Sequence, residues 1–307
     1  MKKQKTPNAK GNKKLGEGLH SGAFLAPSLI GVLVFFFIPF FVVIYYAFVD
    51  IGQNFVLFSN FTRVWGNNAF RTASINTLIF SAMAVPLAVI LSLGLAVLLE
   101  RKIPLKSQLR TFFLSPMMVP VASIVLIWQV LFHRNGAIND VLYNLSQHIG
   151  FFSYERVEWI DWFYSRYTQI PIVILFLWRN LGYNMILFMA ALNNIPKDLL
   201  EVASLEGGKT FFIFRKVKLR FLSPTILFVT ILSVINSFKV FREVFLITDT
   251  TRPYGRLYML QHYMENMFHN LDFQSLATAA IIMALVMIAI IGLMFLIEGI
   301  YGKDVEG

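Results

Sequence analysis

The residues of this chain best suited to chemistry are polar side chains inside an apolar run, residues 170–192. At about 100° per residue, four of them fall within an arc of about 140° on one helical face: Arg179, Asn180, Tyr183 and Asn184. Guanidinium and amide groups donate hydrogen bonds to hydroxyls, and the neighbouring Trp178 offers a flat apolar ring. This face suits a sugar-like solute. Packing between helices, or contact with a partner chain, is the alternative role.

A second polar face lies in another apolar run, where Asn236, Lys239 and Glu243 recur at helical spacing. Lys239 and Glu243 are four residues apart and could form an ion pair. Charge inside a membrane is costly and usually marks a functional site or a pair. Asn236 and Lys239 are therefore further candidates for a substrate pathway, again with a structural role as the alternative. Arg179 and Lys239 could bind an anionic sugar, or each could be paired within the protein.

No pattern in the sequence indicates catalysis, metal binding or nucleotide binding. The chain has no cysteine, and its five histidines form neither an HExxH motif nor a tight cluster. Gly208-Lys209-Thr210 resembles the end of a phosphate-binding loop, but Ala203 stands where that motif needs its first glycine and no apolar strand precedes it. We therefore expect no enzyme, no metal site and no cofactor bound by this chain.

These polar faces must be positioned by membrane-spanning helices. The chain is 57% hydrophobic and 14% charged, whereas soluble domains carry about 25% charged residues. A hydrocarbon core of about 30 Å needs roughly 20 helical residues, and no alternating pattern suggests a barrel. We predict an all-α polytopic membrane protein with six transmembrane helices, at approximately 24–49, 73–99, 112–132, 170–192, 224–247 and 277–300.

Lys and Arg residues indicate the orientation of these helices. They gather in segments 1–20, 100–110 and 193–222, all of which are cytoplasmic if the N-terminus is. We thus predict a cell-membrane protein with both termini in the cytoplasm, a basic tail at 1–20 and a transmembrane domain at 21–307. The net charge of +10 is explained by topology and lipid headgroups, and needs no nucleic acid.

The longest external segment, about 133–169, has room for one or two short helices. Residues 140–149 form a weakly amphipathic candidate. Four aromatic residues of the segment suit a membrane interface: Trp159, Trp162, Tyr164 and Tyr167.

The cytoplasmic segment 196–220 predicts a helix–turn–helix knob. Acidic residues near Pro196 favour a helix start, and Gly207-Gly208 permits a left-handed turn. A second helix would project its aromatic residues: Phe211, Phe212 and Phe214. Exposed aromatics beside a turn are typical anchors for a protein groove. The alternative is a loop packed only on its own bundle.

The stretch 201–224 resembles the signature loop of binding-protein-dependent ABC importer permeases, EAAxxDGAxxxxxFxxIxLPxLxP. The register holds without a gap, with matches at Glu201, Ala203, Gly207, Phe214, Leu219, Leu222 and Pro224. The chain departs from the pattern at Val202, Glu206, Gly208, Val217 and Arg220. Because Arg220 replaces a proline, we expect a less rigid exit from the loop.

The resemblance covers nearly the whole chain and is nearest to the carbohydrate-uptake group of the maltose and glycerol-phosphate type. Residues 71–128 resemble that group's second and third helices, and 236–248 resemble its fifth. The family usually continues there into a Gly-Gly-Pro turn, whereas this chain has Asp249-Thr-Thr-Arg-Pro253.

The resemblance implies a sugar or oligosaccharide importer in a prokaryotic cell membrane. Its expected partners are a second permease, two ATP-binding subunits holding ATP and Mg, and an extracytoplasmic solute-binding protein. Segment 196–220 would be the coupling loop that docks into an ATP-binding subunit, through Glu201, Ala203, Glu206, Gly207, Phe211 and Phe214. An ion-coupled secondary transporter is the alternative, and it should show broken helices and mid-membrane acidic groups. A structural membrane protein would explain the spans but not the knob.

Overall fold

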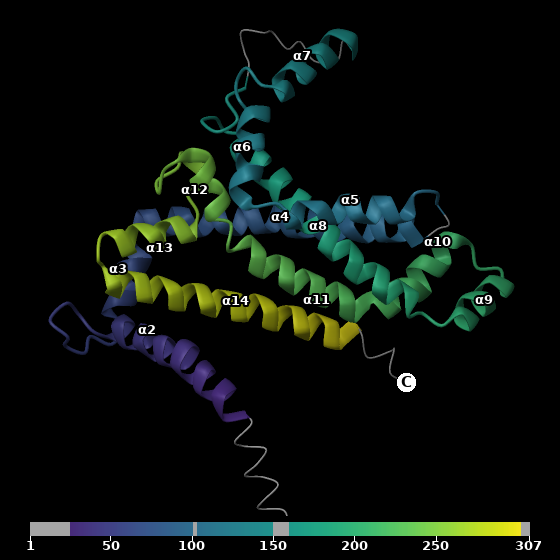
Figure 1. Ribbon diagram of the computed structural model, residues 1–307. Coiled ribbons are helices and arrows are strands. Elements are labelled where there is room, and N and C mark those ends of the chain that lie inside the picture. Colours follow the sequence, from purple (N-terminus) through teal and green to yellow (C-terminus); the bar gives the residue numbers. More distant parts are fainter. Residues whose placement is uncertain (1–24, 101–102, 150–159, 302–307) are drawn as a thin grey trace, which may run out of the picture.

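The computed structural model describes residues 25–100, 103–149 and 160–301. Within these ranges the chain is helical, apart from turns and one isolated bridge between Val49 and Phe55. The long helices run beside one another (Figure 1), beginning with a continuous helix over Leu25–Phe48 that contains α2 (Ile38–Phe48). The others are α4 (Asn68–Glu100), α8 (Gln169–Asn193), α11 (Leu219–Ser237) and α14 (Phe273–Tyr301).

These helices confirm the predicted all-α membrane fold. Five of them are long and apolar enough to span a membrane, and a bent pair brings the number to six among the described residues. The fourth and sixth predicted spans begin and end within a few residues of α8 and α14. The predicted tail at 1–20 lies outside the described residues.

The third span differs from the single helix predicted over 112–132. Two helices, α5 (Lys106–Met118) and α6 (Val121–Leu131), meet there at 101°. Val119 is extended, with φ −83° and ψ 132°, because the ring of Pro120 disfavours a helical conformation in the residue before it. The prediction of one continuous helix was therefore wrong.

The fifth span also differs from the prediction of 224–247. A helix begins with α10 (Thr210–Ile213), continues through the π-turn η3 (Phe214–Lys218) and runs on as α11. Pro224 lies inside this helix and does not open it. The chain then breaks at 238–241 before α12 (Arg242–Thr248). The helix passes through Arg220, and the less rigid exit expected there stays a prediction.

The centre of the bundle is the pairing of α4 with α8, which share two apolar clusters. Small residues on α4, such as Ala84 and Ala88, are fully buried and permit close approach. Gly182 serves the same purpose where α8 crosses α5. A Cβ atom added there would lie 1.9 Å from the carbonyl oxygen of Phe113. Only glycine therefore fits this crossing as it stands.

The two short helices that follow the breaks are joined to each other. The side-chain amide of Gln129 on α6 donates to the carbonyls of Leu246 and Ile247 on α12, at 3.2 and 2.8 Å. Figure 1 shows α6 and α12 side by side, beyond the long helices that precede them.

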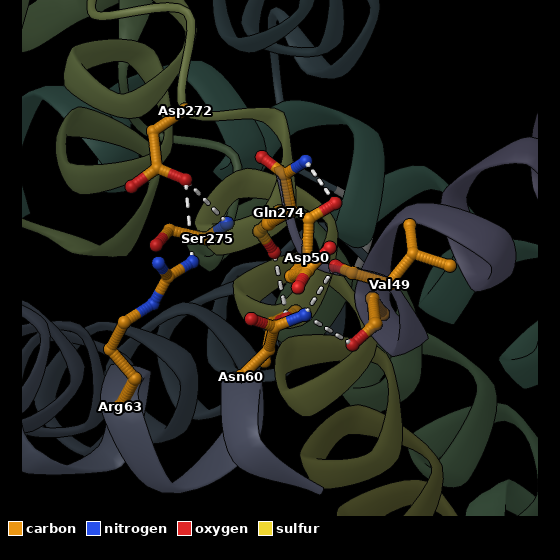
Figure 2. A network of polar contacts seen from close by, with 9 residues as sticks. Val49, Asp50, Asn60, Arg63, Asp272, Gln274 and Ser275 are labelled. Carbon is orange, nitrogen blue, oxygen red and sulfur yellow. Dashed lines mark hydrogen bonds and ion pairs between the residues drawn. The ribbon is translucent and has the colours of Figure 1, made fainter. Parts of the chain in front are cut away.

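One end of the bundle is held by a polar network between α2, α14 and the short helix α3 (Ser59–Gly66), shown in Figure 2. The amide of Asn60, 4% exposed, donates to the carbonyls of Ala47 and Val49 at 3.0 and 2.8 Å. Arg63 pairs with Asp272 at 3.5 Å. α2 and α14 are thereby fixed beside one another, and they run in opposite directions (Figure 1).

Two further helices lie outside the spans. The predicted helix at 140–149 is confirmed as α7 (Ala137–Ile149). Trp162 does not lie at an exposed interface: it is 7% exposed and its indole nitrogen donates to Asn139 Oδ1 at 3.1 Å. Trp159 lies outside the described residues.

In α13 (Leu260–His269), His262 is fully buried against the ring of Phe241, and burial lowers its pKa to about 4.

Candidate functional site

A polar cavity of about 390 Å³ lies within the bundle. It brings together the two polar faces of the sequence, from α8 and from the region around the break in the fifth span. Its polar wall consists of Arg179, Asn180, Tyr183, Asn236, Lys239 and Glu243. Its apolar wall includes Met117, Phe176 and Val240.

Both helix breaks adjoin this cavity. Met117 immediately precedes the bend between α5 and α6, and Lys239 and Val240 lie in the break between α11 and α12. At membrane depth, irregular backbone is tolerated only where it is buried in protein or lines a water-filled cavity. The breaks therefore identify the cavity as a polar compartment inside the apolar bundle.

An ion pair crosses the cavity wall from α8 to α12. Arg179 Nη1 donates to Glu243 Oε1, with the side chains 31% and 13% exposed. The prediction that Glu243 pairs with Lys239 was wrong, because the helix is interrupted between them and the spacing of four residues does not place them together. Lys239 is exposed and forms no ion pair with any residue that the structure describes.

The asparagines of the two faces have different roles in the structure. Asn236 donates to Asn180 Oδ1 at 3.1 Å, so these two amides join α11 to α8 at the cavity. Asn184 does not line it: the residue is 2% exposed and donates to Ser233 Oγ at 3.2 Å between the same helices. Asn184 lies at the far edge of the predicted arc, about 140° around the helix from Arg179.

The aromatic surface of the cavity also differs from the expectation. Trp178 packs against Trp128, with ring centroids 6.0 Å apart, and does not line the cavity. Tyr183, 38% exposed, supplies a ring instead. No sequence pattern singled out Met117, which lines the cavity near the end of α5, beside the bend at Pro120.

The knob at the other end of the long helices has the predicted turn. α9 (Lys197–Leu205) ends where Gly207 adopts φ +82°. The N–H groups of Gly208 and Gly207 donate to the carbonyls of Ala203 and Ser204, at 3.0 and 3.1 Å. This is a Schellman motif, in which glycine supplies the left-handed residue that ends a helix.

The knob exposes a small apolar surface. We call it the knob surface: Leu205, Phe211 and Phe212, which are 87%, 72% and 54% exposed. Glu201 and Glu206 are exposed as well, and Ala203 is half-buried. Phe214 does not project as predicted, because it turns toward a hollow beside the end of α4. There Lys218 pairs with Glu100 at 2.6 Å and joins the knob to α4.

A bundle of spanning helices with a polar cavity at its helix breaks defines a membrane transport protein. The chain belongs to the family of binding-protein-dependent transport system inner membrane components, whose profile matches residues 84–306. Membership decides against the ion-coupled alternative, although the chain does show the broken helices that we expected of such a transporter.

Relatives of known function are similar over most of the chain. The lactose transport system permease protein LacF of Rhizobium radiobacter is 31% identical over 210 residues, 68% of either chain. The trehalose/maltose transport system permease protein MalF of Thermococcus litoralis is 26% identical over 286 residues, 91% of this chain and 93% of that one.

The fold is also that of a solved ABC transporter. A chain of a bacterial alginate ABC transporter, in complex with an alginate pentasaccharide-bound periplasmic protein, matches with a TM-score of 0.79 and 18% identity. The match covers 95% of this chain and 98% of that one. The likeness confirms the helical permease architecture.

Proposed function

We propose that this chain is one permease subunit of an ATP-driven importer of a sugar or oligosaccharide. With a second permease it would form the pathway, in a prokaryotic cell membrane with both termini in the cytoplasm. Two separate ATP-binding subunits would hold ATP and Mg, and an extracytoplasmic binding protein would deliver the solute. The cavity supports this proposal most directly, because its amide, guanidinium and phenol groups can form hydrogen bonds with a hydroxyl-rich solute. The carbohydrate-transporting relatives support the substrate class.

We assign segment 196–220 as the coupling loop. Glu201, Ala203, Glu206 and Gly207 would shape and dock it, Phe211 would enter a groove of an ATP-binding subunit, and Phe214 would anchor the knob to its own bundle. The exposed knob surface supports this assignment, since exposed aromatic side chains such as those of Phe211 and Phe212 are typical anchors of an interface.

The helix that leaves the knob offers a means of coupling. It is continuous from Thr210 to Ser237, and at about 1.5 Å per residue it spans roughly 40 Å between the knob and Asn236 in the cavity wall. Movement of the knob would therefore shift one wall of the cavity directly.

The coupling assignment is tested by Phe211→Ala. Truncating a central aromatic anchor costs about 2 kcal/mol or more of binding free energy, or about 30-fold in affinity. We expect the variant to lose the ATP-binding subunits during purification and to lose most uptake. Phe268→Ala, at a residue 52% exposed on α13, is the matched control. Full retention of those subunits and of uptake by Phe211→Ala would refute the assignment.

The substrate pathway is tested by comparing Asn180→Ala with Asn184→Ala. The first removes a cavity amide that also bonds Phe176 O and Asn236. It should lower stability somewhat and, beyond that, weaken solute uptake about tenfold, as expected for a lost hydrogen bond of 1–1.5 kcal/mol. The second removes a buried contact between helices and should lower thermal stability more than it changes the Michaelis constant. Equal effects of the two variants on both measurements would contradict the division of roles.

A further inference from the structure

One charge in the cavity wall has no counterpart. The guanidinium of Arg179 and the carboxylate of Glu243 neutralise each other. Lys239, which is exposed and lines the same cavity, has no carboxylate within 4.0 Å and no side-chain hydrogen bond among the described residues. Two cations and one anion therefore face the cavity.

The surroundings of Lys239 explain how the ammonium is tolerated without neutralising it. It follows the C-terminal end of α11, where Phe238 caps the helix, and the partial negative charge there favours a cation. The other polar groups of the wall are the amides of Asn180 and Asn236 and the phenol of Tyr183, all uncharged. None of these supplies the full negative charge that an ammonium at membrane depth normally pairs with.

Hydrogen-bond capacity is left over on Arg179 as well. Among the described residues only its Nη1 is engaged, by Glu243, and a guanidinium carries five N–H donors. Asn180 donates one N–H to Phe176 O and Asn236 donates one to Asn180 Oδ1, which leaves each amide a second N–H. The cavity thus combines an unpaired ammonium, spare guanidinium N–H groups and one spare N–H on each of two amides. This set matches a ligand with one acidic group and several hydroxyls.

We propose that the solute is a small saccharide that carries a negatively charged group (a carboxylate, sulfonate or phosphate), and that Lys239 binds this group. The inference rests on the proposed function, because it assigns a substrate class to the same cavity. Asn180, Asn236 and the spare N–H groups of Arg179 bind the hydroxyls. A volume of about 390 Å³ is at the lower end of ligand sites, which favours a mono- or disaccharide unit at a time.

The test uses the full chain, purified with its co-purifying subunits and placed in nanodiscs. Binding is measured for two matched pairs of sugars: digalacturonate and its neutral dimethyl ester, and trehalose 6-phosphate and trehalose. A charge-assisted hydrogen bond is worth about tenfold or more in affinity. We expect at least one acidic sugar to bind about tenfold more tightly than its neutral partner. Lys239→Met should abolish that difference, and Lys239→Arg should keep most of it.

The remaining outcomes separate the two proposals. A neutral sugar that binds the wild-type complex as tightly as its acidic partner overturns the charge inference and leaves the sugar permease standing. An equal loss of both partners in Lys239→Met also overturns it, because the side chain then serves packing and not charge. If none of the four sugars binds a complex that retains its subunits and thermal stability, both the charge inference and the saccharide assignment fail.

Discussion

The contact between α5 and α8 makes a sharp prediction for Gly182→Ala. A Cβ atom at this position would lie 1.9 Å from the carbonyl oxygen of Phe113, whereas ordinary contacts begin at 3.4 Å. The two backbones must therefore separate by about 1.5 Å, and forced overpacking of this kind costs about 1–3 kcal/mol. Alanine favours a helix over glycine by up to about 1 kcal/mol, which offsets only part of the overpacking cost. We therefore expect the variant to be less stable than the wild type.

Two other glycines provide matched controls. Gly94 on α4 and Gly292 on α14 are exposed and have no heavy atom near an added Cβ. Alanine at either position should therefore stabilise its helix by up to about 1 kcal/mol. Thermal unfolding of the purified protein, followed by tryptophan fluorescence, ranks the three variants. Because Met117 on α5 and Arg179 on α8 both line the cavity, uptake should fall in Gly182→Ala alone. If Gly182→Ala were as stable as the controls, the close crossing would be refuted.

Two further predictions concern the short helices α13 and α3, which lie outside the spans. Burial lowers the pKa of His262 from 6.5 to about 4. Between these two values the unfolded chain binds a proton that the folded chain does not. The free energy of unfolding therefore falls as the pH falls from 6.5 toward 4. The free energy of unfolding should drop by about 2 kcal/mol between pH 7 and pH 5, and His262→Gln should remove that slope; an unchanged slope in pH-dependent thermal denaturation contradicts it. Asn60→Ala removes the donor to two buried carbonyls and should cost about 1–3 kcal/mol, against less than 1 kcal/mol for the exposed Asn54→Ala. Equal melting temperatures for these two variants would show that the network of Figure 2 does not hold α2 in place.

Features that depend on local pattern could be predicted from the sequence. Hydropathy located the spans, and the glycine pair located the turn at Gly207, whose φ is +82°. Helical periodicity grouped Arg179, Asn180 and Tyr183 correctly, since α8 is straight through these residues. The same periodicity failed for Lys239 and Glu243, because no proline or glycine between them signals the break at 238–241.

Features that depend on contacts between distant segments could not be predicted. The pair of Arg179 and Glu243 joins residues 64 positions apart, on two segments whose neighbourhood no local pattern reveals. The bend at Pro120 did have a local signal, since Val119 precedes a proline, but the apolar composition of 112–132 outweighed it. Phe214 opens a π-turn and lies against a hollow beside the end of α4, and no residue pattern in this sequence signals either feature.

The hydrogen bonds of Gln129 have a consequence for how the molecule can deform. They tie α6 to α12 across two chain breaks, so a shift of one of these short helices would carry the other with it. Both short helices also pack on α4 and α8, through one shared apolar cluster and through the ion pair of Arg179 and Glu243. Because both chain breaks adjoin the cavity, a coupled shift of α6 and α12 would change two parts of its wall together.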